Sequence, residues 1–216
     1  MNTNYKKLFG LYVIIDPQIT RGRDVFAIAN GALDGGANII QLRDKINDKR
    51  TVVSTAKELR KMCDKSNAVL IINDYVDVAV LADADGVHVG QHDLSLCDTR
   101  KFLSPNQIIG SSNALVEEAI ESDDQGADYI AIGSIFKTTT KSDTRPAGLE
   151  TLREVRNRIS SPIVAIGGIT KERVHSVVQS GADVICVAGA IGLSANPELA
   201  TKQLVESISL AGAKTR

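Results

Sequence analysis

The chain has few of the residues on which several protein classes depend. Aromatic residues make up 4% of its 216 residues, and tryptophan is absent. A surface that stacks nucleic-acid bases on aromatic rings is therefore unexpected. The balance of 25 basic against 26 acidic residues, a formal net charge of −1, also argues against a general nucleic-acid surface. We expect small-molecule partners and no nucleic acid.

Cysteines and long apolar runs are also scarce. Cys63, Cys97 and Cys186 are far apart and form no metal-type pairs, which is typical of a reduced protein. No uncharged apolar stretch approaches the ~18 residues of a membrane span. Residues 1–7 lack the apolar core of a signal peptide. We therefore expect a cytoplasmic protein with no membrane contact.

Short runs rich in valine and isoleucine recur along the chain, nearly continuous rather than alternating. Such runs are typical of strands covered on both faces, and amphipathic segments such as Thr51–Asp64 separate them. The predicted strands are Leu11–Ile15, Asn38–Leu42, Ala68–Ile72, Gly86–Val89, Gln107–Gly110, Asp128–Ile132, Ile163–Ile166 and Asp183–Val187. Eight strand–helix steps favour a closed (β/α)₈ TIM barrel with parallel strands over an open sheet.

A weak repeat supports this count. Gly36-Ala37-Asn38, Gly126-Ala127-Asp128 and Gly181-Ala182-Asp183 each precede a strand, and Ala84-Asp85-Gly86 is a variant. A glycine at this point can end the preceding helix in a left-handed conformation. Because the composition shows no break, residues 1–216 form one predicted domain, with a core of about 8–208 and a frayed tail from about Leu210.

Polar clusters follow the predicted strands, where the ligands of parallel sheets gather. In Gln41-Leu42-Arg43-Asp44-Lys45, residues 41, 43 and 45 point to one side of an extended chain. An amide, a guanidinium and an ammonium on one side suit a polyanion such as diphosphate. A solvated loop after the strand is the alternative.

Two carboxylates follow the third and fourth predicted strands. Asp74 and Asp93 would be neighbours in a barrel and could hold Mg²⁺, which uses one or two carboxylates plus substrate phosphates. Helix N-capping is the alternative for each, and their coincidence on adjacent strands favours the metal. Asn73 could orient a substrate amine or ring nitrogen. His88 lies within a strand and is expected to be a hydrogen-bonded core residue.

The second half of the chain offers sites for another anion. The polar segment from Ser134 to Ala147 is long enough to be a substrate loop or lid. In it, Thr138, Thr139, Thr140 and Lys141 could hold a phosphate or carboxylate, or form an ordinary polar loop. Gly167-Gly168 and Ala188-Gly189 follow strands seven and eight, where barrels often bind phosphate through backbone N–H groups.

Catalytic motifs of other kinds are missing. The chain has no G-x-x-x-x-G-K-[ST] motif, no dinucleotide fingerprint after its first strand, no Ser-His-Asp order, and no lysine within a strand for a Schiff base. The remaining chemistry is electrostatic: one anion held by cations, a divalent metal and a second anionic partner.

From about Leu11 to Ile191 the chain resembles the thiamine-phosphate synthase family. The resemblance rests on an ordered series: Gln41 to Lys45, Asn73-Asp74, His88-Val89-Gly90-Gln91-His92-Asp93, Gly133 to Lys141, and Gly167-Gly168. It implies a (β/α)₈ transferase of thiamine biosynthesis. Such an enzyme joins hydroxymethylpyrimidine diphosphate to thiazole phosphate and releases pyrophosphate by a Mg²⁺-assisted dissociative substitution.

The resemblance also implies roles for individual residues. The pyrimidine diphosphate site comprises Gln41, Leu42, Arg43, Asp44, Lys45, Asn73, Ser112 and Lys141, of which Arg43, Lys45, Lys141 and Ser112 take part in catalysis. Asp74 and Asp93 would bind Mg²⁺. The thiazole phosphate would contact Thr138, Thr139, Thr140, Gly168, Ala188 and Gly189.

Two positions depart from the family pattern. Ala114 stands where a histidine is frequent, which implies a more open mouth, and Gly189 stands where a serine is usual. Other readings are a thiazole tautomerase-like relative, a sugar-phosphate isomerase or epimerase, and a non-catalytic phosphate-ligand sensor. The isomerase would need an acid/base pair, which the sequence does not reveal. Whether the chain forms a homo-oligomer, and whether the thiazole is carboxylated, stay open.

Overall fold

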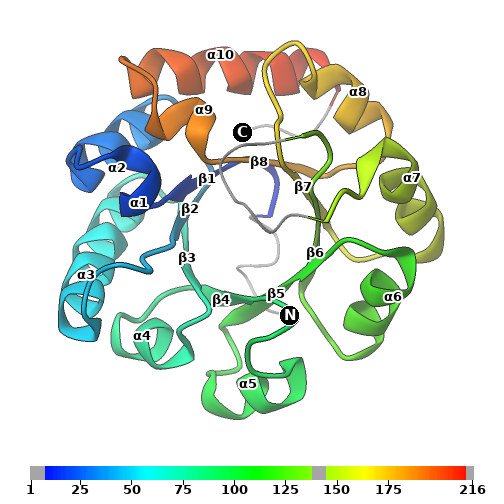
Figure 1. The fold of residues 1–216 in the computed structure, drawn as a ribbon. Helices are drawn as coiled ribbons and strands as arrows, with labels where there is room; N and C mark the ends of the chain where they lie inside the picture. Colours follow the sequence, from blue (N-terminus) through cyan, green and yellow to red (C-terminus); the bar gives the residue numbers. More distant parts are fainter. Residues whose placement is uncertain (1–7, 138–144, 213–216) are drawn as a thin grey trace.

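Eight parallel strands close into a barrel in the computed structural model, which describes residues 8–137 and 145–212 (Figure 1). The strands pair in chain order, and β8 pairs with β1. They are β1 (Gly10–Ile15), β2 (Ile39–Leu42), β3 (Val69–Asn73), β4 (Gly86–Val89), β5 (Ile108–Asn113), β6 (Tyr129–Ile132), β7 (Ile163–Ile166) and β8 (Val184–Val187). The predicted TIM barrel is confirmed.

Helices surround the barrel on the outside (Figure 1). They are α1 (Pro17–Thr20), α2 (Val25–Asp34), α3 (Lys49–Lys65), α4 (Val76–Leu81), α5 (Leu96–Phe102), α6 (Val116–Asp124), α7 (Gly148–Arg158), α8 (Val174–Gln179), α9 (Gly189–Gly192) and α10 (Pro197–Leu210). In α3, Val52, Ala56 and Leu59 are buried at helical spacing against the sheet. Among the described helices, none is both long and apolar enough to cross a membrane.

Alternate strand residues fill two separate apolar cores. One set packs against the helices, and the other fills the barrel interior with residues that include Ile39, Ile71 and Val164. Gly110 makes room there for Tyr129, because a Cβ on this glycine would lie 1.9 Å from a carbon of the tyrosine ring. Space inside the barrel is therefore shared between apolar residues and a few polar ones.

The fifth strand is longer than predicted. It continues through Ser111, Ser112 and Asn113, whereas the sequence placed its end at Gly110. These polar residues pair with β6, since Ser112 lies opposite Ala131 and Asn113 opposite Ile132. Ser112 is therefore held on a strand and not on a loop.

The weak sequence repeat corresponds to a repeated contact at the amino ends of the strands. Before β6, Asp128 Oδ2 accepts hydrogen bonds from Ile109 N at 2.8 Å and Arg100 Nη2 at 2.6 Å. Asp85 binds Leu70 N and Arg60 in the same way, and Asp183 binds Ile163 N and Arg156. Asn38 Oδ1 accepts from Leu11 N at 3.2 Å in the first copy. The repeat thus joins successive strand–helix units.

Candidate active site

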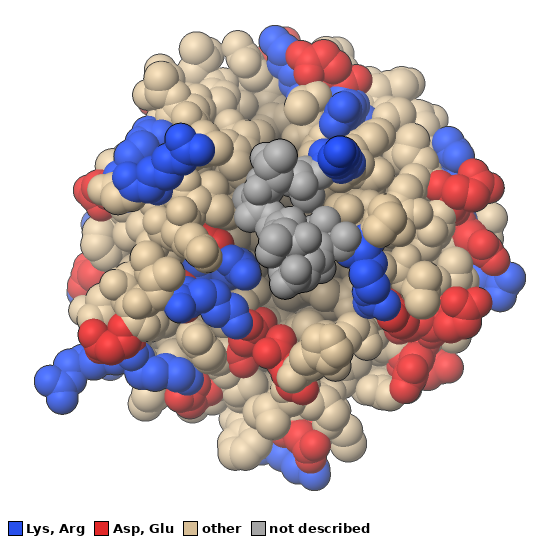
Figure 2. All heavy atoms as spheres, in the orientation of Figure 1, with Lys and Arg blue, Asp and Glu red and all other residues tan. Residues whose placement is uncertain are grey.

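Two cations of the predicted diphosphate site follow β2, and each is held by a carboxylate of a neighbouring strand end. Arg43 forms an ion pair with Asp16, which follows β1, and Lys45 forms one with Asp74, which follows β3. Asp16 is 1% exposed, while Arg43 and Lys45 keep 23% and 35% of their side chains exposed. Figure 2 shows basic and acidic side chains together near the centre of this face. The mouth of the barrel, formed by the carboxyl ends of the strands, therefore carries mixed charge, and its partly exposed cations are accessible to an anion.

Asp74 and Asp93 lie beside each other at the same mouth. Burial, together with the neighbouring Asp74 carboxylate, raises the pKa of Asp93. Asp93 Oδ2 accepts a hydrogen bond from Gly90 N at 2.8 Å. The backbone of Asp74 is left-handed, with φ of 60°, a strained conformation of the kind that clusters at functional sites. Two close carboxylates of this kind favour a cation between them.

Helix capping does not account for either carboxylate. Tyr75 occupies the N-cap position of α4 and makes no side-chain capping bond, and Ser95 caps α5 by accepting from Asp98 N. The capping alternative is thus wrong for both aspartates. Within the described residues, no group of three or more His, Cys, Asp or Glu side chains could hold a metal. A carboxylate pair fits Mg²⁺, which takes its other oxygen ligands from water and phosphate.

Three further predicted residues line the barrel side of the mouth. Gln41 lies one alternation above Ile39 of the interior core, and Asn73 lies likewise above Ile71. Ser112 hydroxyl lies 2.8 Å from His88 Nε2, and His88 is buried and hydrogen bonded as expected. These side chains therefore converge from β2, β3 and β5.

The structure does not bring Leu42 and Asp44 into this group. Leu42 is 1% exposed and belongs to the core between sheet and helices. Asp44 accepts hydrogen bonds from Ile46 N, Asn47 N and the Asn47 side chain, so its carboxylate shapes the loop after β2. Of this cluster, Gln41, Arg43 and Lys45 therefore stay the candidate ligand-binding side chains.

The predicted second anion site is described in part. Gly168 has φ of 62°, and a Cβ there would lie 2.7 Å from Lys137 O, so a side chain would collide with backbone. Gly189 begins α9, after Ala188. Within the described part of the chain, the N–H groups of Gly168 and Gly189 donate to no protein acceptor. Thr138, Thr139, Thr140 and Lys141 lie outside the described residues.

Ala114 itself is buried in the structure, and the expected opening of the mouth there stays a prediction. Ala114 is 4% exposed, and its N–H donates to Glu118 Oε2 at 2.9 Å. Arg145 donates to the same carboxylate through its two terminal nitrogens, Nη1 at 2.5 Å and Nη2 at 2.9 Å. Glu118 of α6 therefore joins the backbone of Ala114 to Arg145, which precedes α7.

Sequence reasoning missed Asp16, which it left without a role. Its carboxylate accepts from Gln18 N at 2.9 Å, caps α1 and also binds Arg43. No sequence signal indicated the Arg43 contact, which joins residues 27 positions apart. Asp16 therefore positions a candidate diphosphate ligand.

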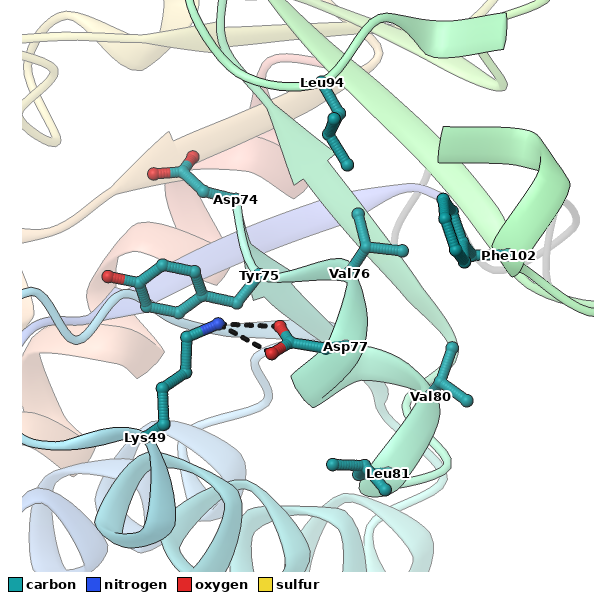
Figure 3. A pocket seen from close by; sticks show the side chains of 9 residues that line it. All are labelled: Lys49, Asp74, Tyr75, Val76, Asp77, Val80, Leu81, Leu94 and Phe102. Carbon is teal, nitrogen blue, oxygen red and sulfur yellow. Dashed lines mark hydrogen bonds and ion pairs between the residues drawn. The ribbon is translucent and has the colours of Figure 1, made fainter. Parts of the chain in front are cut away.

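A separate groove of about 610 Å³ lies outside the barrel over α4 and α5 (Figure 3). Its lining is largely apolar and includes Leu81, Leu94 and Phe102. Asp74 stands at its edge with the carboxylate turned away from these side chains, and Lys49 donates to both oxygens of Asp77 at 2.7 and 2.8 Å. Apart from Asp74, its lining contains no predicted site residue, so we place the chemistry at the barrel mouth.

Comparisons with known proteins show which family the chain resembles. A family model described as thiamine monophosphate synthase matches residues 11–191. The thiamine-phosphate synthase of Shouchella clausii is 42% identical over 94% of this chain and 97% of its own length. That of Methanoculleus marisnigri is 40% identical over 96% and 99%.

Solved structures give the same result. The thiamine phosphate pyrophosphorylase of Pyrococcus furiosus superposes with a TM-score of 0.89 at 36% identity, covering 97% of this chain and 99% of that one. A 3-hexulose-6-phosphate synthase, at 18% identity and a TM-score of 0.67, shares the fold alone. The chain belongs to the thiamine monophosphate synthase family.

Proposed function

We propose that this chain is a thiamine-phosphate synthase that condenses hydroxymethylpyrimidine diphosphate with thiazole phosphate and releases pyrophosphate. The observation that carries the proposal is the convergence of Arg43 and Lys45 with the Asp74–Asp93 carboxylate pair at one mouth. Cations beside a candidate metal site suit a substrate whose leaving group is a diphosphate.

The proposed chemistry is a dissociative substitution. As the bond between the exocyclic methylene and the diphosphate breaks, negative charge builds on the leaving oxygens, and Arg43 and Lys45 stabilise it. Mg²⁺ held by Asp74 and Asp93 would supply further positive charge to the same oxygens. The resemblance adds Lys141 to these cations. No protein nucleophile is required, because the residues supply positioning and electrostatics.

The amino-substituted pyrimidine carries the resulting positive charge, and the thiazole nitrogen then attacks the methylene carbon. We assign Gln41, Asn73 and Ser112 to the pyrimidine side, since they line the barrel side of the mouth. The N–H groups of Gly168 and Gly189 suit the thiazole phosphate, together with Thr138, Thr139, Thr140 and Ala188 from the resemblance.

Mixing the purified chain with both phosphorylated ligands and Mg²⁺ tests this function through a coupled pyrophosphate assay. The synthase should release pyrophosphate only when both ligands are present. A sensor or a tautomerase-like relative would bind ligand without releasing pyrophosphate above a protein-free control. The tautomerase-like alternative also has no need for Gln41, Arg43, Lys45, Asp74 and Asp93 together, and all are present.

A further inference from the structure

Five polar side chains form a continuous hydrogen-bonded network across the barrel interior. Gln41 on β2 contacts Tyr12 on β1 at 2.6 Å, and Tyr12 contacts Tyr129 on β6 at 3.2 Å. Tyr129 hydroxyl lies 3.0 Å from His88 Nδ1 on β4, and His88 Nε2 lies 2.8 Å from Ser112 Oγ on β5. The two ends, Gln41 and Ser112, are among the residues we assign to the pyrimidine.

The three middle residues of this network are buried. Tyr12 and Tyr129 are 1% and 0% exposed, and His88 is 8% exposed. Burial raises the pKa of both tyrosines above the ordinary value, so their hydroxyls stay protonated. The His88 and Tyr129 rings stack with centroids 5.6 Å apart, which holds the imidazole in place. Each hydroxyl therefore has one hydrogen to donate.

These hydrogens give the network one direction of hydrogen-bond donation. Gln41 Nε2 donates to the Tyr12 oxygen, and among the described residues the other partner of this hydroxyl is Tyr129, so Tyr12 directs its own hydrogen to Tyr129. Tyr129 then donates to His88 Nδ1, which leaves the imidazole hydrogen on Nε2. That hydrogen is donated to Ser112 Oγ, and the serine keeps its own hydrogen for another acceptor. In the opposite tautomer, His88 Nδ1 would donate to Tyr129 and Nε2 would accept the hydrogen of Ser112.

We propose that Tyr12, Tyr129 and His88 are positioning residues that set the hydrogen-bonding polarity of the pyrimidine pocket. Gln41 presents its carbonyl oxygen as an acceptor, and Ser112 presents its hydroxyl as a donor. This pair complements an aminopyrimidine, whose amino group donates and whose ring nitrogen or attached phosphate accepts. An oxo group in place of the amino group would put one acceptor against another. The inference rests on the function proposed above.

The tautomer of His88 reports this polarity directly. We expect ¹⁵N NMR of the full chain, at a pH of about 8.5 where a free histidine is neutral, to show His88 protonated on Nε2. The signal is assigned by its loss in His88→Gln. A neutral His88 protonated on Nδ1 would overturn the proposal, because Ser112 would then donate its hydrogen to His88 and not to the substrate. This measurement needs no catalysis.

Tyr129→Phe tests how the network affects substrate recognition, since it removes the hydroxyl that joins Tyr12 to His88 and keeps the aromatic ring. We expect KM for the aminopyrimidine diphosphate to rise about tenfold, KM for thiazole phosphate to stay unchanged, and discrimination against the oxo analogue to fall. Ser122→Ala is the matched control, because it removes a buried hydrogen bond that is not part of the network: Ser122 Oγ donates to Asn113 Oδ1 at 2.9 Å. Tyr12→Phe replaces Tyr129→Phe if that variant does not fold.

The outcomes separate the two proposals. Equal changes in both KM values, or unchanged discrimination, would overturn the positioning role while leaving the synthase activity in place. A wild-type chain that forms no product with either pyrimidine would refute the synthase activity instead, and the NMR result would still report the direction of the hydrogen bonds.

Discussion

Lys45 forms an ion pair with Asp74, joining the loops that follow β2 and β3. Lys45, which we assign to the diphosphate, is thus paired with Asp74, which we assign to the metal. Because both would act on the same diphosphate, their contributions to catalysis are coupled.

A double-mutant cycle tests this coupling. Lys45→Ala and Asp74→Ala should each lower turnover by about 10²–10³, the size expected for one preorganised charge contact. The double variant should lose much less than the product of the two losses, because either change already disturbs the same diphosphate. Steady-state kinetics of the four proteins measure this, and independent multiplicative losses would count against a shared ligand.

The second carboxylate should be needed for metal-dependent activity. We expect Asp93→Ala to fold normally and to lose turnover severely, since Asp93 is exposed at the mouth and supports no helix cap. Exhaustive EDTA treatment should abolish wild-type activity, and added Mg²⁺ should restore it. Wild-type rates after EDTA would exclude Asp74 and Asp93 as catalytic metal ligands. Circular dichroism of Asp93→Ala provides the folding control.

Asp16 should affect binding through Arg43. We expect Asp16→Asn to raise KM for the pyrimidine diphosphate by about tenfold, because the guanidinium loses its charged partner. Asp24→Asn is a matched control: Asp24 caps α2 by accepting from Phe26 N at 2.9 Å, as Asp16 caps α1, but it does not hold Arg43. Equal effects of both variants on KM would show that capping alone matters at Asp16.

The repeated contact at the amino ends of the strands predicts a loss of stability without a loss of activity. Asp128→Ala leaves Ile109 N–H without its acceptor and should cost about 1–3 kcal/mol in urea unfolding. Asp128→Asn keeps an oxygen acceptor, as Asn38 does naturally, and should cost less. kcat should stay unchanged in both variants, because this end is opposite the mouth. A large fall in kcat for a fully folded variant would contradict this division.

Thiol reactivity should follow burial. Burial raises the pKa of Cys63 to about 12 and also raises that of Cys186, so at pH values near 8 neither forms the reactive thiolate. Cys97 is exposed. A thiol reagent should therefore label one of the three cysteines quickly in the folded chain and all three after denaturation. Rapid labelling of Cys63 or Cys186 in the native chain would show that the core opens there.

The sequence was sufficient to predict the barrel because its strands are separated by regular signals. Gly181 has the left-handed conformation expected before a strand, with φ of 104°, and Asp83 takes that conformation in the variant copy, with φ of 50°. The end of β5 was predicted too early, because Ser111, Ser112 and Asn113 are polar and their strand character comes from pairing with β6. The local sequence pattern does not reveal that these residues pair with β6.

The candidate site was predictable where its residues follow strand ends in order. Asp74 and Asp93 could be paired from sequence because adjacent strands bring them together. The Tyr12–Tyr129 contact spans 117 positions and depends on which interior residues meet across the closed barrel. Contacts across the barrel depend on strand tilt and packing, which residue spacing does not specify.

Phosphorus NMR of one reaction mixture tests the central claim most directly. With wild-type chain and Mg²⁺, the two diphosphate signals of the pyrimidine substrate should disappear as one pyrophosphate signal grows, and thiazole phosphate should convert to thiamine phosphate in equal amount. Lys45→Ala should slow both changes together. Unchanged spectra with folded wild-type protein, or pyrophosphate without thiamine phosphate, would contradict the account.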